Sequence, residues 1–213
     1  MPDLVVQVSA GLEWRSLLNL LGKGALPGET TPVGRSVEVV IDTNSGPLAA
    51  RLLHGGVGKI HSAAAAQYAI CTWQPQLLAL IGTCGALDPS LRELDVIVAS
   101  RTVVYDIDAG MGEATAAMIA RFTTGLPALC EPPHLPPGTR CGTLLTADRD
   151  LTQANADQVS DIPDADVAGQ LGKYEQNTPP VMGRLWQTLG SCLDDGLLDK
   201  ARALSLAGRK PRA

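Results

Sequence analysis

Aromatic side chains are scarce in this chain of 213 residues and make up only 3% of it. Basic charge is also low, because a net charge of -5 and a pI near 5.1 provide no positive field that would attract nucleic acid. The one dense basic cluster, GRKPRA, stands at the C-terminus, where a frayed tail is the simpler interpretation. We therefore expect no nucleic-acid partner.

Long apolar runs are missing as well. No stretch approaches the roughly 20 apolar residues that a membrane-spanning helix needs. The first residues, MPDLVVQVSA, lack the basic region that precedes the apolar core of a secretory signal. These absences predict a cytoplasmic protein that makes no contact with a membrane.

The cysteines are few, odd in number and scattered. None belongs to a C-x-x-C pair, so the spacing favours neither a disulfide framework nor a zinc site. We expect buried thiols and no bound metal; the five positions are Cys71, Cys84, Cys130, Cys141 and Cys192.

Short apolar strands and amphipathic helices alternate along the chain, which indicates a layered α/β domain. The run LLALIG is continuous and apolar, which is typical of a central strand buried on both faces. Helices are expected around 13–22, 60–73, 114–122 and 181–189, and strands at 3–10, 36–42, 48–55, 77–82, 95–106 and 141–148. We therefore expect residues 1–213 to form one domain, a three-layer α/β/α sandwich with a mixed central sheet.

The stretch HGGVGKIHSAAAAQYA, from His54 to Ala69, raises the question of a phosphate-binding loop. A nucleotide P-loop needs Ser or Thr after its lysine, and here Ile60 follows Lys59. The dinucleotide fingerprint G-x-G-x-x-G also fails, because His61 takes the place of its last glycine. We therefore expect structural glycines that let the backbone turn sharply and let an alanine-rich helix lie close to the sheet.

Several stretches in order resemble the 5'-methylthioadenosine/S-adenosylhomocysteine nucleosidases of the nucleoside phosphorylase superfamily. They cover most of the first 165 residues, and the order and spacing of the first three make the resemblance fairly specific. The stretches are GGVGKIHSAAAAQ, PQLLALIGTCGALDPSLRELDVIVAS, YDIDAGMG, LLTADRDL and the VSD at 159–161. The resemblance implies a homodimeric purine nucleosidase that works without a cofactor.

The family's acid and water-positioning residues correspond to Asp161 and Glu13 in this chain. In the family, the acid protonates the purine at N7 while the second carboxylate orients the water that attacks the anomeric carbon. Ser160 forms the family's Ser-Asp pair with Asp161. Considered alone, Glu13 is also typical of a first-turn helix acid, and Asp161 of a turn or cap residue.

The turn IGTCGAL supplies further binding residues in the resemblance, namely Thr83, Cys84 and Gly85, with Thr83 beside the ribose and the attacking water. Related phosphorylases carry a phosphate-binding arginine three residues before that hydroxyl, where this chain has Leu80. Because leucine cannot replace the bidentate contact of arginine with phosphate, hydrolysis is favoured over phosphorolysis.

A second group of binding residues comes from YDIDAGMG and TADRDL. The resemblance places Tyr105 and Met111 near the dimer interface and the sulfur-bearing tail of the substrate, and Leu151 among the substrate-binding residues. Apolar packing is an equally good explanation for Tyr105 and Met111.

Two departures from the family pattern leave alternatives open. Asp150 stands where the family has an aromatic residue that stacks on the purine. The family also places a helix-containing crossover, with a ribose-binding Met-Glu pair, where this chain has only 151–158, so we expect an additional segment between about 150 and 159. The alternatives to a nucleosidase are a catalytically weakened nucleoside-binding or storage relative, and a nucleoside phosphorylase.

Overall fold

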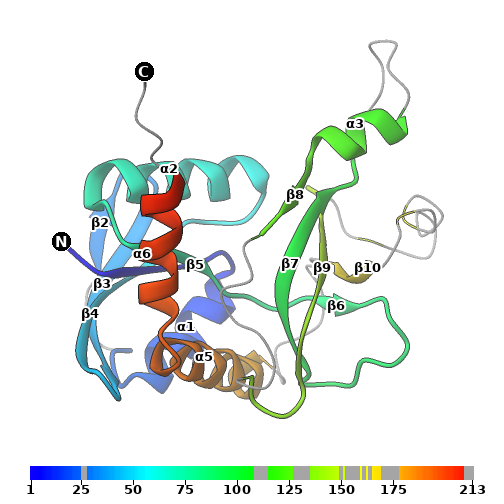
Figure 1. The fold of residues 1–213 in the computed structure, drawn as a ribbon. Helices are drawn as coiled ribbons and strands as arrows, with labels where there is room; N and C mark the ends of the chain where they lie inside the picture. The colour runs from blue at the N-terminus through cyan, green and yellow to red at the C-terminus, as the bar shows by residue number, and fades with distance from the viewer. Residues whose placement is uncertain are drawn as a thin grey trace.

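The computed structural model describes residues 1–24, 28–107, 115–126, 135–148, 151, 159, 162, 165–168 and 178–208. Its strands form two mixed five-stranded sheets that lie side by side (Figure 1). The first sheet has the order β2-β3-β4-β1-β5, and the second β6-β10-β9-β7-β8. The α/β class with mixed sheets and helical layers is confirmed, while the hydrogen bonding divides the expected central sheet in two.

The bounds of the elements follow the expected alternation closely. The strands of the first sheet are β1 Leu4–Val8, β2 Glu29–Thr31, β3 Gly34–Thr43, β4 Gly46–His54 and β5 Leu77–Leu80. Those of the second are β6 Gly85–Ala86, β7 Val96–Val104, β8 Thr123–Gly125, β9 Thr139–Thr146 and β10 Ala165–Ala168. The helices are α1 Gly11–Leu20, α2 Lys59–Trp73, α3 Thr115–Arg121, α5 Thr178–Asp194 and α6 Leu197–Gly208.

Helices cover both faces of the first sheet, which gives the expected three layers there. Successive residues of a strand point to opposite faces. Accordingly, Leu4, Val6 and Val8 of β1 pack in one core with α1, α5 and α6, whereas Val5 packs with α2 on the other face. In Figure 1, α2 runs above this sheet, and α1 and α5 lie below it.

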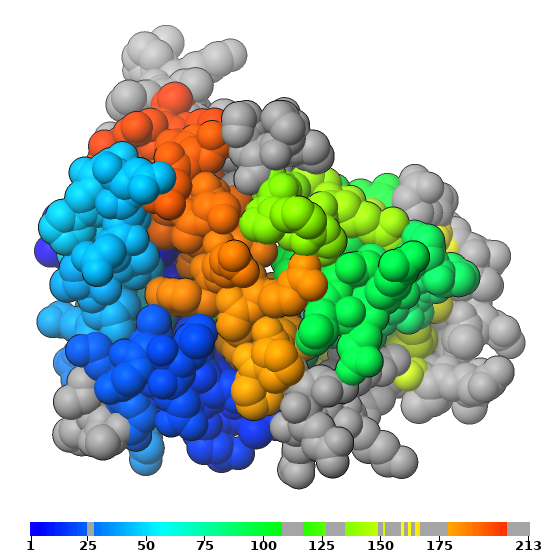
Figure 2. All heavy atoms as spheres, turned by 90° about the horizontal axis from the view of Figure 1, so that it is seen from below, coloured from blue at the N-terminus to red at the C-terminus, as the bar shows by residue number. Residues whose placement is uncertain are grey.

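The last long helix, α5, joins the two halves of the molecule. It packs against α1 and also contacts β3 and β7, which belong to different sheets. Met182, one of its residues, is completely buried in the first core. Figure 2 shows this helix in orange between the blue N-terminal residues and the green residues of the second sheet.

The run LLALIG forms β5, but the prediction of a central strand buried on both faces is wrong. Among the described strands, β5 is the last in its sheet, and Leu80 is 57% exposed. The strand that is buried throughout is β1, which lies between β4 and β5 and pairs in parallel with both. A continuous apolar run of four residues does not distinguish these two positions.

The prediction of buried thiols is also wrong for the described cysteines. Cys71, Cys84 and Cys141 are exposed, and Cys192 is buried but disulfide-bonded. For Cys71 the reason is helical spacing, because α2 buries Ala65, Ala69 and Trp73, and Cys71 points away from that stripe. Cys130 lies outside the described residues.

The glycines before α2 have the structural role expected from the sequence. A Cβ on Gly55 would lie 2.4 Å from the Cβ of Ala65, so only glycine lets the helix approach this closely. Gly56 and Gly58 have φ angles of +79° and +96°, which side chains disfavour. The loop is therefore shaped for a tight strand-to-helix connection.

The strands β9 and β10 are parallel neighbours in the second sheet. Most of the chain between them lies outside the described residues. The additional segment expected between about 150 and 159 therefore stays a prediction.

A cluster of three charged residues links the ends of strands from both sheets. Lys59, the first residue of α2, pairs through Nζ with Asp106 after β7, and its Nζ lies 3.5 Å from Oδ2 of Asp148 after β9. The backbone N–H of Lys59 donates to Asp148 Oδ1 at 2.7 Å, and that of Asp148 donates to Asp106 Oδ2 at 2.9 Å. We call these residues the Lys59 cluster; it holds the start of α2 against the carboxyl ends of β7 and β9.

Replacing Lys59 by methionine should lower the free energy of unfolding by about 1–3 kcal/mol, since the Asp106 side chain is only 10% exposed and would lose its cation. Urea unfolding at pH 7 measures this cost. Lys200→Met is the matched control, because the exposed Lys200–Asp195 pair should contribute less than about 1 kcal/mol. Equal costs for both variants would contradict a structural role for the cluster.

The same difference should depend on pH. Burial favours the neutral form of Asp106, but the Lys59 ammonium and the N–H of Asp148 outweigh it and hold the pKa of Asp106 below its usual value. The stabilisation is therefore present above the ordinary aspartate pKa of about 4 and is lost as the pH falls through the lower folded pKa. The gap between the parent protein and Lys59→Met should shrink in that acidic range.

Candidate active site

Glu13 lies in the first turn of α1, just beyond the carboxyl end of β1, an interior strand of the first sheet. Although it is charged, it is only 5% exposed. Its Oε2 accepts the backbone N–H of Ala10 at 3.1 Å, which is the N-terminal half of a capping box. The interpretation of Glu13 as an acidic residue in the first turn of a helix is therefore confirmed by this hydrogen bond.

The other oxygen of Glu13 reaches the end of the neighbouring strand. Oε1 accepts the backbone N–H of Thr83 at 2.6 Å and the Thr83 hydroxyl at 2.7 Å. A Cβ on Gly82 would lie 3.2 Å from the same oxygen, so a small residue is favoured there. The structure thus brings together Glu13 and Thr83, the two residues for which the family resemblance implies contacts with the water and the ribose.

These contacts occupy most of the hydrogen-bond acceptor positions of the Glu13 carboxylate. A carboxylate offers about four acceptor positions. Among the described residues, two donors occupy Oε1 and one occupies Oε2. The remaining position, on Oε2, is available to a water or a substrate hydroxyl.

His54 lies at the carboxyl end of β4, beside the same turn. Its ring stacks on Trp14, with centroids 5.5 Å apart and planes 16° from parallel. Burial lowers the pKa of His54 and the Arg35 charge lowers it further, against opposing effects of a hydrogen bond to the Ser9 backbone and the Glu13 charge. The imidazole is therefore neutral at pH 7, and sequence analysis gave it no role.

Of the other predicted binding residues, Cys84 lies close enough to Glu13 for its thiol to feel the Glu13 charge. Gly85, the next residue, is buried in β6. Tyr105 and Leu151 lie together in an apolar cluster with Val103 and Leu145 on the second sheet. For Tyr105, apolar packing within its own chain is thus observed.

Ser160, Asp161 and Met111 lie outside the described residues, so their roles stay predictions. Val159, immediately before the Ser-Asp pair, is helical and buried in the cluster of Tyr105. It precedes β10 in the chain, whereas the family's pair follows a late strand.

The Lys59 cluster answers the question raised by the glycine-rich loop. A helix N-terminus after such a loop can bind phosphate, but here the Asp148 carboxylate accepts the first N–H of α2. The Lys59 ammonium is paired with two carboxylates. The loop is thus occupied by the protein's own anions. The three charged residues of the Lys59 cluster belong to the motifs GGVGK, YDID and TAD, but the spacing of these motifs in the sequence does not predict that the residues are in contact.

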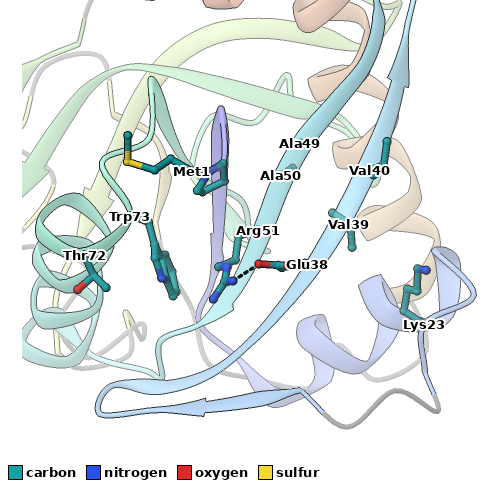
Figure 3. A pocket seen from close by; sticks show the side chains of 11 residues that line it. Met1, Lys23, Glu38, Val39, Val40, Ala49, Ala50, Arg51, Thr72 and Trp73 are labelled. Atoms are coloured by element: carbon teal, nitrogen blue, oxygen red, sulfur yellow. Dashed lines mark hydrogen bonds and ion pairs between the residues drawn. The ribbon is translucent and has the colours of Figure 1, made fainter.

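Another recess, of about 540 Å³, lies at the opposite ends of the same strands (Figure 3). It is lined by Met1 and by Ala49 and Ala50 at the start of β4. Two cationic side chains, Lys23 and Arg51, also line it, and Arg51 forms ion pairs with Glu29 and Glu38. Ligands of α/β sheets bind at the carboxyl ends of strands, so this recess is not the candidate site.

Within the described ranges, no group of three or more His, Cys, Asp or Glu side chains is placed to hold a metal ion. In the same part of the chain, no helix is long and apolar enough to cross a membrane.

Cys84 offers a chemical test of the geometry around Glu13. Although the residue keeps an exposed surface, neighbouring atoms partly desolvate its thiol, and this burial, with a further contribution from the Glu13 charge, raises the pKa of Cys84 to about 11. Alkylation by iodoacetamide needs the thiolate, so its rate at Cys84 should still be rising at pH 10. Glu13→Gln should increase the rate at pH 8, because it removes a nearby negative charge. A rate that levels off near pH 9, as read by peptide mass spectrometry, would contradict the arrangement.

Comparison with known proteins is consistent with this architecture. The family model described as "Phosphorylase superfamily" matches residues 7–158. A curated 5'-methylthioadenosine/S-adenosylhomocysteine nucleosidase from Marinomonas sp. (strain MWYL1) is 32% identical over 57 residues, which are 27% of this chain and 25% of that protein. The aligned part thus spans a quarter of the curated relative's length.

Solved structures share the fold over nearly the whole chain. S-adenosylhomocysteine nucleosidase from Streptococcus pyogenes, in complex with 5-methylthiotubericidin, has a TM-score of 0.64 at 19% identity, covering 91% of this chain and 97% of that one. MTA/SAH nucleosidase from Streptococcus pneumoniae, in complex with 8-aminoadenine, has a TM-score of 0.67 at 14% identity, with 90% and 99% covered.

A third structure, the futalosine hydrolase of Helicobacter pylori strain 26695, has a TM-score of 0.60 at 15% identity, with 96% and 97% of the two chains covered. Identities this low show the shared fold. The family model, in contrast, spans well over half of the sequence and includes both Glu13 and Thr83. The chain therefore belongs to the phosphorylase superfamily.

Proposed function

We propose that this protein is a purine nucleosidase that hydrolyses the N-glycosidic bond of nucleosides of the 5'-methylthioadenosine/S-adenosylhomocysteine type. The observation that carries the proposal is the buried Glu13 carboxylate, which three donors hold and which keeps one acceptor position that no donor among the described residues fills. The names of the curated relative and of the solved neighbours support the same reaction class.

In the proposed reaction, Glu13 Oε2 accepts a hydrogen bond from a water and directs its oxygen to the anomeric carbon. The bond between that carbon and the purine N9 breaks, and its electron pair moves onto the base. Asp161, in its protonated form, gives its proton to N7, while the water's proton passes to Glu13. The products are the free base and the free sugar.

Water, and not phosphate, is the proposed nucleophile. Leu80 ends β5 as an exposed residue at the position where related phosphorylases carry a phosphate-binding arginine. The nearby glycine-rich loop is already occupied by Asp148. Neither feature offers phosphate the bidentate cation that it ordinarily receives in proteins.

The second candidate is a nucleoside-binding relative with weakened catalysis. The sequence feature that favours it is Asp150, which replaces the aromatic residue expected to stack on the purine. Such a protein would bind methylthioadenosine by calorimetry yet release no adenine. Activity in phosphate-free buffer therefore separates the two candidates.

Glu13→Gln and Asp161→Asn should each lower kcat for adenine release by about 10²–10⁴-fold, because each removes one partner in proton transfer. The assay follows adenine from methylthioadenosine in phosphate-free buffer. Glu38→Gln, at an exposed side chain of β3, is the control and should keep the parent rate. Thermal unfolding of every variant separates lost chemistry from lost folding. An Asp161→Asn enzyme with the parent kcat would reject the acid assignment.

The homodimer and the cytoplasmic location are also proposals. Two-fold dimers are the commonest closed assemblies, and the resemblance assigns the segment after β7 to an interface. Light scattering at micromolar concentration should give a mass of two chains. A single-chain mass would contradict the dimer without affecting the chemistry proposed for Glu13.

A further inference from the structure

A pocket of about 740 Å³ opens between α1 and the β2–β3 hairpin, at the carboxyl end of β4. Volumes of a few hundred Å³ are typical of sites for small molecules. Its wall includes Gly11, Trp14 and Arg15 of α1, Arg35 of β3, and His54. We call it the Arg15–Arg35 pocket.

The charge of this pocket is positive and uncompensated. Its lining holds two arginines and neither Asp nor Glu. Neither guanidinium has an ion pair or hydrogen bond in the structure's described part. Arg51, in the recess of Figure 3, differs because two glutamates neutralise it. On a chain with a net charge of -5, a pocket of this kind attracts an anion.

The pocket adjoins the proposed reaction centre. Gly11 and Trp14 flank Glu13 in the first turn of α1, and the Ala10 N–H that holds Glu13 immediately precedes Gly11. His54 feels both the Glu13 charge and the Arg35 charge, so it lies within reach of each. The flat stack of His54 on Trp14 therefore forms part of the pocket wall next to the catalytic carboxylate.

A bound nucleoside has one part that can extend into such a space. The base departs from the anomeric carbon, whereas a substituent on C5' projects from the other end of the ribose. When that substituent ends in a carboxylate, a guanidinium can bind it through two parallel N–H···O bonds. A methylthio group has no such acceptor and leaves both arginines hydrated.

We propose that the Arg15–Arg35 pocket binds the carboxylate of a 5'-substituent and makes the protein prefer nucleosides whose tail carries one, as the homocysteine tail of S-adenosylhomocysteine does beside its ammonium group, over methylthioadenosine. This inference rests on the proposed nucleosidase function, and it names the substrate class of that site. Arg15 and Arg35 determine specificity; they take no part in breaking the glycosidic bond.

The first test compares kcat/KM for S-adenosylhomocysteine and methylthioadenosine in the parent protein and in the double variant Arg15→Met/Arg35→Met. The ratio of the two values should fall by about 10–100-fold, mainly through KM for S-adenosylhomocysteine, because charge-assisted hydrogen bonds are lost. Arg92→Met removes an exposed arginine outside the pocket and should leave the ratio unchanged. Equal losses for both substrates would overturn the proposal.

A second experiment separates the effect of the charge on the 5'-substituent from the effect of its length. 5'-Butylthioadenosine has a long uncharged tail and serves as the probe. It should behave like methylthioadenosine and be insensitive to the two arginine substitutions. If it responds to them as S-adenosylhomocysteine does, the pocket recognises apolar length and the proposal is wrong.

A binding measurement tests the pocket independently of the proposed reaction. Calorimetry on Glu13→Gln, in which turnover is blocked, should show tighter binding of S-adenosylhomocysteine than of 5'-butylthioadenosine, and the preference should vanish with Arg35→Met. If the parent protein hydrolyses neither nucleoside, the proposed function fails while this preference still tests the pocket. Sugar 1-phosphate formed on adding inorganic phosphate would instead assign the arginines to phosphate and overturn the proposal.

Discussion

The burial of one carboxylate constrains the whole region around the candidate site. Removing a charge from water is costly unless hydrogen bonds replace the lost hydration. Glu13 satisfies this requirement with donors from two elements that are far apart in the sequence, the start of α1 and the end of β5. The parallel pairing of β1 with β5 brings these ends together, so the sheet register and the site geometry depend on each other.

The second constraint is the close approach of α2 to the first sheet. Gly55 allows it sterically, and the hydrogen bonds from Gln7 to the Ser62 carbonyl and hydroxyl, at 3.0 and 2.9 Å, fix its position. The helix then presents Lys59 to carboxylates that follow β7 and β9. A motif that resembles a phosphate loop therefore connects the two sheets, because its N-terminal charge and its lysine are both met by internal anions.

Local patterns predicted the elements well, and long-range contacts much less. Strand and helix positions follow from apolar spacing, and the short distance between Gly55 and Ala65 follows from small residues on both sides. The edge position of β5 could not be predicted, since an apolar run has the same appearance in the middle of a sheet and at its edge. The pairing of Glu13 with Thr83 was accessible only through the family resemblance. The Lys59 cluster was missed because electrostatic pairing across 47 and 89 positions leaves no periodic signal.

A capping role alone does not account for the environment of Glu13. A capping acid needs one bond to the N-terminal backbone, and Oε2 supplies it through Ala10. The two bonds from Thr83 to Oε1 come from another strand and add nothing to the cap. They hold the carboxylate plane, so that the acceptor position on Oε2 that no described donor fills has a fixed direction. At a buried charge such a position favours a water molecule, because an unfilled acceptor would carry the cost of lost hydration. Water positioning, which the proposed hydrolysis requires, is thus the role that we propose for Glu13 in addition to the cap.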